Sequence, residues 1–520
     1  MNESPQAIQT EADHRALIEG LLRHLQDAGE QELITTHISS VILAGEYAYK
    51  IKKPLDLGFL DFSTLERRRF CCEEELRLNA RLAPGIYLGV LPITGTLRQP
   101  VLGGDGEPLE YVVRMRRFDQ RGVLSNHLDL LDPAVIDTIA RRVARFHREI
   151  ARAPAASEYG EPAHLAQPMW DNFTHIRQLV DDVEVTQRLE ALEHWTRQRY
   201  QALGELLPRR KRDGYIRECH GDLHLGNIAL VGAGPLIFDG IEFNPGLRWI
   251  DTMSELAFLL MDIQEKGRPE LATRALNSYL AETGDYEGVA LLRFYQVYRA
   301  MVRAKVAAIM ASQAVPPAKP DYTAFRAYLA LAEGYMRDAS PCLMLTRGPS
   351  GSGKSTKARD LLGRVPAIWL RSDVERKRLA GLRARDSSGS ALDGGIYSAE
   401  FTRRTYAHLH ALSGEVLAAG YAVLVDATFL DRAQREPFYG LAEELGCPVL
   451  VLDLQVPEAL LRERVERRAA RGGDVSEAGL EVLERQLAGY RPLDDDEREH
   501  TLVLIPDDAT WVGRVAERCG

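Results

Sequence analysis

The chain contains 520 residues, of which 45% are hydrophobic and 27% charged, a composition that is typical of a soluble globular protein and excludes a disordered or fibrous one. Its formal net charge of -10 disfavours nucleic acid as the main partner, and no segment approaches the roughly 18 uncharged apolar residues of a membrane span. The polar N-terminus has no apolar signal-peptide segment. We therefore expect a cytoplasmic protein of two or three domains with no membrane partner.

The N-terminal part of the chain is predicted to begin with an amphipathic helix at 12–26, where leucines recur at helical spacing. A second helix is expected at 64–82. Short runs rich in β-branched or aromatic residues lie on both sides of that helix and predict strands at 33–37, 41–43, 47–51, 87–91 and 111–115. Strands, one helix and further strands form the element order of a protein-kinase-like small lobe, which we place at about 30–118.

The middle of the chain is mainly helical by pattern. Its periodicity and apolar runs predict helices at 133–206, 248–312 and 322–336, with a strand at 235–238. A proline-rich stretch at 315–320 interrupts the helical pattern. We therefore expect a helical large lobe at about 119–339 and a domain boundary near residue 340, which makes 1–339 an α+β bilobal domain.

The last part of the chain alternates short apolar runs with helical stretches. The runs predict strands at 342–346, 367–370, 422–425, 449–452 and 501–504. Such alternation favours a parallel sheet with helices on both faces. We therefore expect 340–520 to form a second domain of the α/β P-loop class.

The six cysteines do not follow the spacing of metal ligands or of redox motifs. They are Cys71, Cys72, Cys219, Cys342, Cys447 and Cys519. We expect them to be reduced structural thiols.

The first motif, HGDLHLGN at 220–227, has the H-x-D-x-x-x-x-N spacing of a kinase-type catalytic loop. Asp222 is the candidate catalytic residue, because phosphoryl transfer needs a carboxylate that orients the attacking hydroxyl and accepts its proton. Asn227 and Asp239 are the candidate metal ligands, and their oxygens suit Mg²⁺. His220 is expected to support the loop. Taken alone the triplet could be an ordinary polar turn, but Asn227 and Asp239 in register favour the catalytic interpretation.

A lysine on the third predicted strand would complete this site by binding the α- and β-phosphates of a nucleotide. Lys50 occupies that place, and its carboxylate partner should be one of Glu73, Glu74 and Glu75, among which we favour Glu75. Lys52 and Lys53 compete for the role, although strand alternation turns Lys53 away from the face of Lys50 and Lys52.

Residues at about 30–310 resemble the aminoglycoside phosphotransferase family, whose HGDxHxxN motif matches at 220–227 and whose following metal-binding aspartate matches Asp239. The resemblance implies the roles given above, with ATP as the nucleotide. Two features depart from the kinase pattern. No G-x-G-x-x-G loop is present, and only 241–244 follows the Asp239-Gly240 pair where protein kinases have an activation segment. The second departure argues against a protein substrate.

The second motif, GPSGSGKS at 348–355, is a complete G-x-x-x-x-G-K-[ST] P-loop between a predicted strand and a predicted helix. Its backbone N–H groups and the helix N-terminus would bind phosphate oxygens, Lys354 would reach the β- and γ-phosphates, and Ser355 would bind Mg²⁺. The candidate nucleotide-binding residues are Gly348, Gly351, Ser352, Gly353, Lys354, Ser355 and Thr356.

Other candidates for this second site follow along the chain. Asp373 and Arg376, one turn apart, could accept a hydroxyl proton and hold a substrate anion, or could be a helix cap and a solvated arginine. Asp426 ends a buried strand and suits the water shell of the metal. Arg464 and Arg468 share one helix face and could close over the transferring phosphates, or could form a solvated surface.

Residues at about 341–490 resemble the P-loop kinases of the polynucleotide-kinase, gluconate-kinase and zeta-toxin type, whose SDxxR and lid Arg-x-x-x-Arg elements match Asp373, Arg376, Arg464 and Arg468. This resemblance implies phosphorylation of a hydroxyl group. Acidic and basic residues are nearly balanced after residue 340, so small molecules are favoured over RNA as substrates.

Together the two resemblances indicate a bifunctional aminoglycoside phosphotransferase/ATP-binding protein. The leading hypothesis is a Mg²⁺- and ATP-dependent kinase with two sites for hydroxyl-bearing small molecules and no obligate protein partner. Two alternatives remain open. One domain could bind ATP to regulate the other, or the P-loop domain could act on 5'-hydroxyl ends of RNA or DNA.

Overall fold

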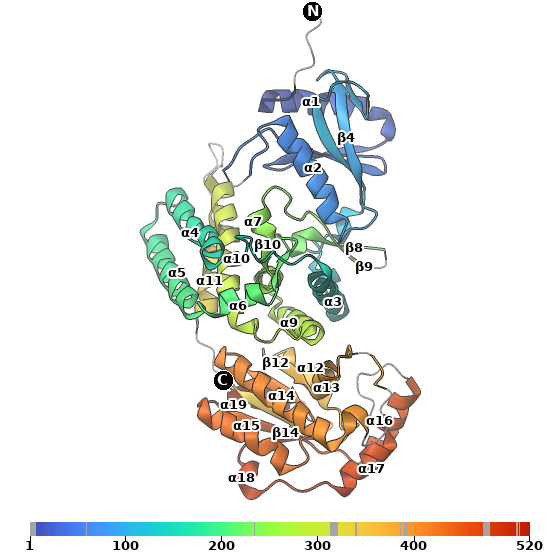
Figure 1. The fold of residues 1–520 in the computed structure, drawn as a ribbon, viewed down its shortest axis with the longest axis vertical. Helices are drawn as coiled ribbons and strands as arrows, with labels where there is room; N and C mark the ends of the chain where they lie inside the picture. The colour runs from blue at the N-terminus through green and yellow to red at the C-terminus, as the bar shows by residue number, and fades with distance from the viewer. Residues whose placement is uncertain are drawn as a thin grey trace, which may run out of the picture. The chain divides into compact units, whose positions relative to one another are not determined.

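The computed structural model describes residues 7–58, 60–232, 234–312, 321–337, 341–384, 386–388, 394–471, 479–505, 508 and 510–519 (Figure 1). By packing, the chain divides into two compact units. Unit 1 comprises Met1–Val135, Glu149–Asp171 and Tyr200–Asp262, and unit 2 comprises Ile136–Arg148, Asn172–Arg199 and Ile263–Gly520. The chain passes between the units several times, so the domain boundary near residue 340 stays a prediction from the sequence.

Unit 1 contains a six-stranded antiparallel sheet with the order β1-β2-β3-β6-β4-β5. The strands are β1 (Gln31–Thr35), β2 (Ser39–Ala44), β3 (Tyr47–Lys52), β4 (Tyr87–Gly95), β5 (Pro100–Leu102) and β6 (Glu110–Arg116). The meander β1-β2-β3 confirms the predicted strand order. The sequence did not reveal β5, because three residues are too short for an alternating pattern to stand out.

Two helices accompany this sheet, α1 (Glu11–His24) and α2 (Leu65–Asn79), and both begin at a threonine whose hydroxyl accepts a backbone N–H. Thr10 and Asp13 form a capping box at the start of α1. Helix α1 buries Leu17 and Leu21 in one core with Ile42 and Ile51 of the sheet. The predicted helix at 64–82 is therefore present, three residues shorter at its C-terminal end.

His14 of α1 is only 2% exposed, and its Nε2 lies 3.0 Å from the Ser40 hydroxyl. Burial, with help from Lys53 and Arg68, lowers the pKa of His14 to about 4 from its ordinary 6.5. As the pH falls below 6.5, His14 is therefore protonated in the unfolded chain but stays neutral in the folded chain. The free energy of unfolding decreases until about pH 4, where the folded chain is protonated as well. We expect the titration of His14 to lower the free energy of unfolding by about 3 kcal/mol between pH 6.5 and pH 4.

The measurement is urea unfolding of wild type and His14→Gln between pH 4 and 7.5. The glutamine keeps a side-chain hydrogen-bonding group but does not titrate, so the difference between the two curves isolates the histidine. A difference that does not change with pH would contradict the shifted pKa.

The remaining strands and helices of unit 1 position the first motif. A two-stranded pair is formed by β7 (Ile216–Glu218) and β10 (Trp249–Asp251), and a hairpin by β8 (Ile228–Val231) and β9 (Gly234–Ile237). The helices here are α6 (Leu206–Arg212), α7 (Pro245–Arg248) and most of α8 (Thr252–Glu265). HGDLHLGN follows β7 and leads into β8, and Asp239 follows β9. The sequence predicted β9 but not β7, β8 or β10.

Unit 2 contains a five-stranded parallel sheet with the order β12-β13-β11-β14-β15, as the sequence predicted. Its strands are β11 (Leu343–Arg347), β12 (Ile368–Arg371), β13 (Val423–Asp426), β14 (Val449–Leu454) and β15 (Thr501–Leu504). The helices that connect and follow them are α12 (Lys354–Leu362), α13 (Ser372–Leu379), α14 (Ala399–Ala418), α15 (Arg432–Glu444), α16 (Glu458–Arg471), α17 (Leu480–Ala488), α18 (Asp495–Arg498) and α19 (Trp511–Cys519).

Further helices of the chain include three that lie wholly in unit 2, α9 (Pro269–Thr283), α10 (Val289–Ser312) and α11 (Thr323–Met336). The others are α3 (Pro133–Glu149), α4 (Pro162–Leu179) and α5 (Val183–Ala202). Within the described part of the chain, none of the helices combines the length and the apolar character needed to cross a bilayer.

One face of the parallel sheet packs against α12 and α19, which share a buried core with alternate residues of the strands. In this core Cys342 and Cys519, 177 positions apart in the sequence, form a disulfide. The expectation that all six cysteines are reduced is therefore wrong for this pair, and the distance in sequence is why spacing could not reveal it. The four other cysteines carry free thiols, and the pKa values of all four are raised by burial.

Candidate functional sites

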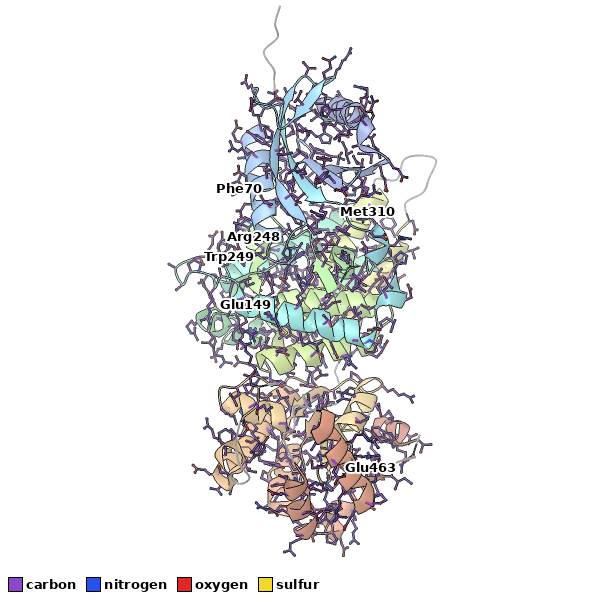
Figure 2. The ribbon with its side chains drawn as sticks, turned by 90° about the vertical axis from the view of Figure 1, so that its right-hand side faces the viewer. Phe70, Glu149, Arg248, Trp249, Met310 and Glu463 are labelled. Carbon is purple, nitrogen blue, oxygen red and sulfur yellow. A yellow bond between two sulfur atoms is a disulfide. The ribbon has the colours of Figure 1, made fainter. Side chains whose placement is uncertain are left out.

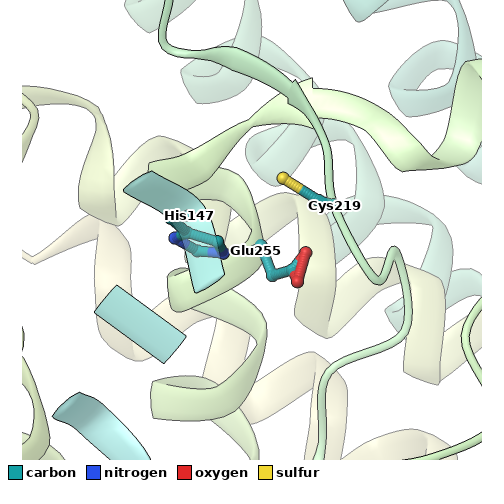
Figure 3. A group of neighbouring side chains, drawn as sticks. All are labelled: His147, Cys219 and Glu255. Carbon is teal, nitrogen blue, oxygen red and sulfur yellow. The ribbon is translucent and has the colours of Figure 1, made fainter. Parts of the chain in front are cut away.

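The loop with the first motif is held by two carboxylates of α8. Glu255 accepts the His220 N–H at 2.8 and 2.9 Å, and Asp262 accepts the Leu225 N–H at 2.8 Å. Figure 3 shows the Glu255 carboxylate close to the loop at Cys219. Sequence analysis missed both carboxylates. The available signal was that Glu255 and Asp262 lie two turns apart on α8 and enclose an uninterrupted apolar run at 256–261.

His220 supports the loop, as predicted. Its Nδ1 accepts the Asp222 N–H at 3.3 Å, so its ring proton lies on Nε2 and is donated to the Phe238 carbonyl at 2.9 Å. Burial lowers the pKa of His220, although Glu255 and Asp222 act in the opposite direction. The ring is therefore neutral and connects the loop to the end of β9.

Asp222 and Asn227, the candidate base and metal ligand, are in direct contact. The Asn227 amide donates to the backbone carbonyl of Asp222 at 2.9 Å and to its carboxylate at 3.0 Å. His224, which the sequence did not assign, lies 3.4 Å from the same carboxylate. The Asp222 side chain is 37% exposed, so it is held in place and still accessible to an acceptor.

Asp239, Lys50 and Glu75 come together beside this loop. The Lys50 ammonium lies 2.8 Å from Glu75 and 2.5 Å from Asp239. Burial alone would lower the pKa of Lys50, but Asp239 and Glu75 raise it well above its ordinary value. Asp239 has φ of 62°, a conformation that costs energy in a residue with a side chain, and its N–H donates to the Tyr87 hydroxyl at 3.2 Å.

Glu75 also binds a second lysine. Lys52 contacts its other carboxylate oxygen at 2.7 Å and pairs with Glu242 as well. Lys52, Glu75 and Glu242 are at most 4% exposed. The two lysines lower the pKa of Glu75 to about 2 against the effect of burial. The sequence treated Lys52 as a competitor of Lys50, whereas the structure uses both, and it missed Glu242.

The neighbouring glutamates have other partners. Glu73 pairs with Arg69 at the surface, and Glu74 binds Arg77 and Arg248. The Arg248 side chain, labelled in Figure 2, also donates to the Glu242 carbonyl at 3.0 Å. Glu75 is therefore the only one of the three described glutamates that pairs with Lys50, and the short segment after Asp239 is fixed by buried charges.

Replacing Lys52 with methionine should destabilise the protein by about 3–5 kcal/mol, because Glu242 would lose its buried cationic partner. Urea unfolding of the full chain measures this cost. Lys53→Met is the matched control, since the Lys53 side chain is partly exposed and its ammonium donates to the Thr36 carbonyl rather than to a buried carboxylate. Equal losses in the two variants would contradict a special role for the buried pair.

A cavity of 280 Å³ opens between the sheet of unit 1 and the end of β9. Its lining includes Val41, Ala48, Met115, Phe118 and Phe238, and it ends at Lys50 and Asp239. Apolar walls that end in a lysine and an aspartate can hold a planar base with its phosphates directed toward the charges.

The second motif forms the turn between β11, the central strand, and α12. This is the carboxyl end of a parallel strand, where α/β proteins bind nucleotides. Gly351 has φ of 84°, and a Cβ there would meet the Leu461 carbonyl at 2.9 Å. Gly348 and Gly353 also have positive φ. The glycines of the motif therefore allow the tight loop that a phosphate cradle requires.

Lys354 and Ser355 have the partners expected in a P-loop. The Lys354 ammonium donates to the Gly348 and Pro349 carbonyls at 2.9 Å, and the Ser355 hydroxyl donates to Asp426 at 2.7 Å. Burial lowers the pKa of Lys354 to about 8, against the effect of Asp426 and Asp373. The Ser355 and Asp426 oxygens, one from the first turn of α12 and one from the end of β13, suit a hard cation.

The two candidate arginines of α16 reach the loop. Arg468 donates to the Ser350 hydroxyl at 2.9 Å, and Arg464 donates to the Gly351 carbonyl at 3.4 Å. The solvated-surface alternative is therefore not what the structure shows for these two side chains. Gln486 of α17 accepts the Ser350 N–H at 2.7 Å, a contact that sequence analysis missed.

These residues border a cavity of 930 Å³ whose lining includes Ser355, Thr356, Asp373, Arg376 and Asp426. The Arg376 guanidinium already donates to the Ile396 carbonyl at 2.6 Å and the Thr402 hydroxyl at 3.1 Å. Its predicted contact with a substrate anion stays a prediction. Ser352 of the same loop is buried and does not line this cavity.

Comparison with known proteins agrees with this geometry. The profile of a family described as "Phosphotransferase enzyme family" matches residues 72–292, and that of a family described as "AAA domain" matches 343–493. The chain is 32% identical over 449 residues to "Uncharacterized protein Rv2004c" of Mycobacterium tuberculosis, with 86% of this chain and 87% of the relative covered. The N-terminal domain is of the kinase-like aminoglycoside phosphotransferase type, and the C-terminal domain is of the P-loop kinase type.

Two solved structures are similar to this chain with lower sequence identity. A choline/ethanolamine kinase family protein from Mesorhizobium loti is 12% identical with a TM-score of 0.40, covering 63% of this chain and 94% of its own. A gluconokinase from Sinorhizobium meliloti is 20% identical with a TM-score of 0.25, covering 34% and 95%.

Proposed function

The chain belongs to the family of the mycobacterial protein Rv2004c, and on that premise we propose that it is a bifunctional kinase. It uses ATP and Mg²⁺ to phosphorylate hydroxyl groups of small molecules at two separate sites. The supporting observation is that each site has a carboxylate for the acceptor beside residues suited to phosphate and metal. The domain boundary near residue 340 and a cytoplasmic location are parts of the same proposal.

At the first site Asp222 orients the acceptor hydroxyl and accepts its proton, while the acceptor oxygen bonds to the γ-phosphorus and the bond to the leaving ADP breaks. Lys50 steadies the nucleotide phosphates and is itself oriented by Glu75. Asn227 and Asp239 supply oxygen ligands for Mg²⁺, which neutralises phosphate charge when bound. The exposed carboxylate of Asp222 is what the acceptor approaches.

At the second site, phosphate binding, metal binding and proton acceptance are the tasks of a different set of residues. Lys354 and the N–H groups of the P-loop bind phosphates, and Ser355 and Asp426 hold the metal and its water shell. Arg464 and Arg468 close on the transferring phosphates, and Asp373 accepts the acceptor proton. The cavity of 930 Å³ has room for a nucleotide and a small acceptor together.

The test is a metabolite-extract screen by mass spectrometry for the mass gain of one phosphoryl group. Wild type, Asp222→Asn and Asp373→Asn are run in parallel with Mg²⁺ and ATP. Each variant should lose one set of products and keep the other. If no product forms with wild type, or if neither substitution removes any product, the proposed function is wrong.

A further inference from the structure

Helix α9 contacts the outer edge of the parallel sheet in unit 2. The side chain of Asn277, 7% exposed, donates to the Ala367 carbonyl at 2.9 Å and accepts the Trp369 N–H at 2.7 Å. Strand β12 is the edge strand, so these backbone groups face outward from the sheet. One amide side chain thus satisfies two groups that an edge strand leaves unpaired.

The turn after α9 contacts the helix that follows β12. The Tyr286 hydroxyl donates to Glu375 of α13 at 2.9 Å. Glu375 is fully buried and also receives Arg378 at 3.0 Å, with the His408 ring at 3.4 Å. Because a buried carboxylate is costly without its donors, Glu375 needs these partners. Arg378 belongs to α13 itself, so Tyr286 and His408 are the two of them that connect α13 to other elements.

Arg378 makes the reverse contact, from α13 to the C-terminus of α9. Its guanidinium donates to the Ala281 carbonyl at 2.7 Å, where the last turn of a helix leaves carbonyls unpaired. Gly284 ends α9 with φ of 74°, and a Cβ there would lie 2.7 Å from the same guanidinium. The helix end is therefore shaped to receive Arg378.

Asp373, the candidate base of the second site, lies between these anchors. Trp369 precedes it on β12, and Glu375 and Arg378 follow it on α13, a helix of eight residues. A helix this short gains little stability from itself and depends on tertiary contacts. Helix α9 lies inside the segment that matches the phosphotransferase family, yet it packs in unit 2.

We propose that α9 and the turn after it are a working part of the second site. Asn277, Tyr286 and Glu375 are positioning residues that hold β12 and α13 so that Asp373 faces the cavity. The catalytic part of this inference rests on the proposed function of the second site. The scaffold part does not, since it concerns only how β12 and α13 are held.

The test uses Asn277→Leu and Tyr286→Phe in the full chain. Tyr279→Phe is the matched control, since Tyr279 is a buried tyrosine of α9 whose hydroxyl contacts His147 at 2.9 Å. Hydrogen exchange of the peptide 368–379 should become at least about 10-fold faster in the two variants and stay unchanged in the control. The kcat of the second site should fall about 10-fold while its nucleotide Kd is unchanged, because the P-loop is not touched.

Each possible result of this experiment tests either the scaffold part or the catalytic part of the inference. Unchanged exchange in both variants overturns the inference whatever the activity. Faster exchange with unchanged kcat overturns the positioning role and leaves only a structural contact. If wild type transfers no phosphoryl group at the second site but exchange responds as expected, the proposed function falls and the scaffold role stands.

Discussion

Asp222→Asn is expected to lower kcat at the first site by about 10²- to 10⁴-fold, the range that proton transfer to a positioned base contributes. Asparagine has the same shape and still offers an oxygen to the Asn227 amide, so the loop should keep its conformation. It cannot accept the proton of the acceptor hydroxyl. The nucleotide Kd of this site should therefore change little while turnover is nearly lost.

The measurement is steady-state turnover of the first-site product, with nucleotide affinity followed by a fluorescent ADP analogue. Asp119→Asn serves as the control, because Asp119 is an exposed aspartate of the same unit that pairs with Arg121. Comparable turnover in Asp222→Asn and Asp119→Asn would show that Asp222 is not the base. A large loss of nucleotide affinity would point instead to a role in metal binding.

The sequence could predict those parts of the two sites whose spacing is local. The steps from Asp222 to Asn227 and from Gly348 to Ser355 are fixed within one loop, so the motif already contains the geometry. Lys53 was separated from Lys50 on the assumption that the strand continues, and in the structure it lies just beyond the end of β3. The strands of the parallel sheet were predictable for a different reason, because each contains a short apolar run.

Contacts made across long stretches of sequence could not be predicted. Lys52 meets Glu242, and Glu255 meets His220, only after the chain has folded back on itself. The sequence singles out Lys52 and His220 in their own segments, but it does not show which carboxylate each of them meets. The disulfide of Cys342 is the same case, since its partner is 177 positions away. For Arg376 the sequence showed a possible role but not its partners. The motif predicted a ligand contact, whereas the guanidinium donates to the Ile396 carbonyl and the Thr402 hydroxyl within the protein.

Lys354→Met should have the largest effect at the second site. The ammonium is the positive charge closest to the P-loop carbonyls and the expected contact of the β- and γ-phosphates. Loss of one charged hydrogen-bond donor should weaken nucleotide binding roughly 10- to 100-fold. Turnover at this site should fall further, because the lysine also neutralises charge on the transferring phosphoryl group.

Lys357→Met is the matched control, since Lys357 lies one turn further along α12 and contacts the Trp511 ring outside the cavity. Titration with a fluorescent nucleotide and product assays for both sites measure the effect. If Lys354→Met and Lys357→Met bind nucleotide equally well, the P-loop assignment is wrong. If Lys354→Met also reduces turnover at the first site, while no product is ever formed at the second, then the P-loop domain regulates its neighbour by binding nucleotide. Independent losses at the two sites would instead establish two kinases in one chain.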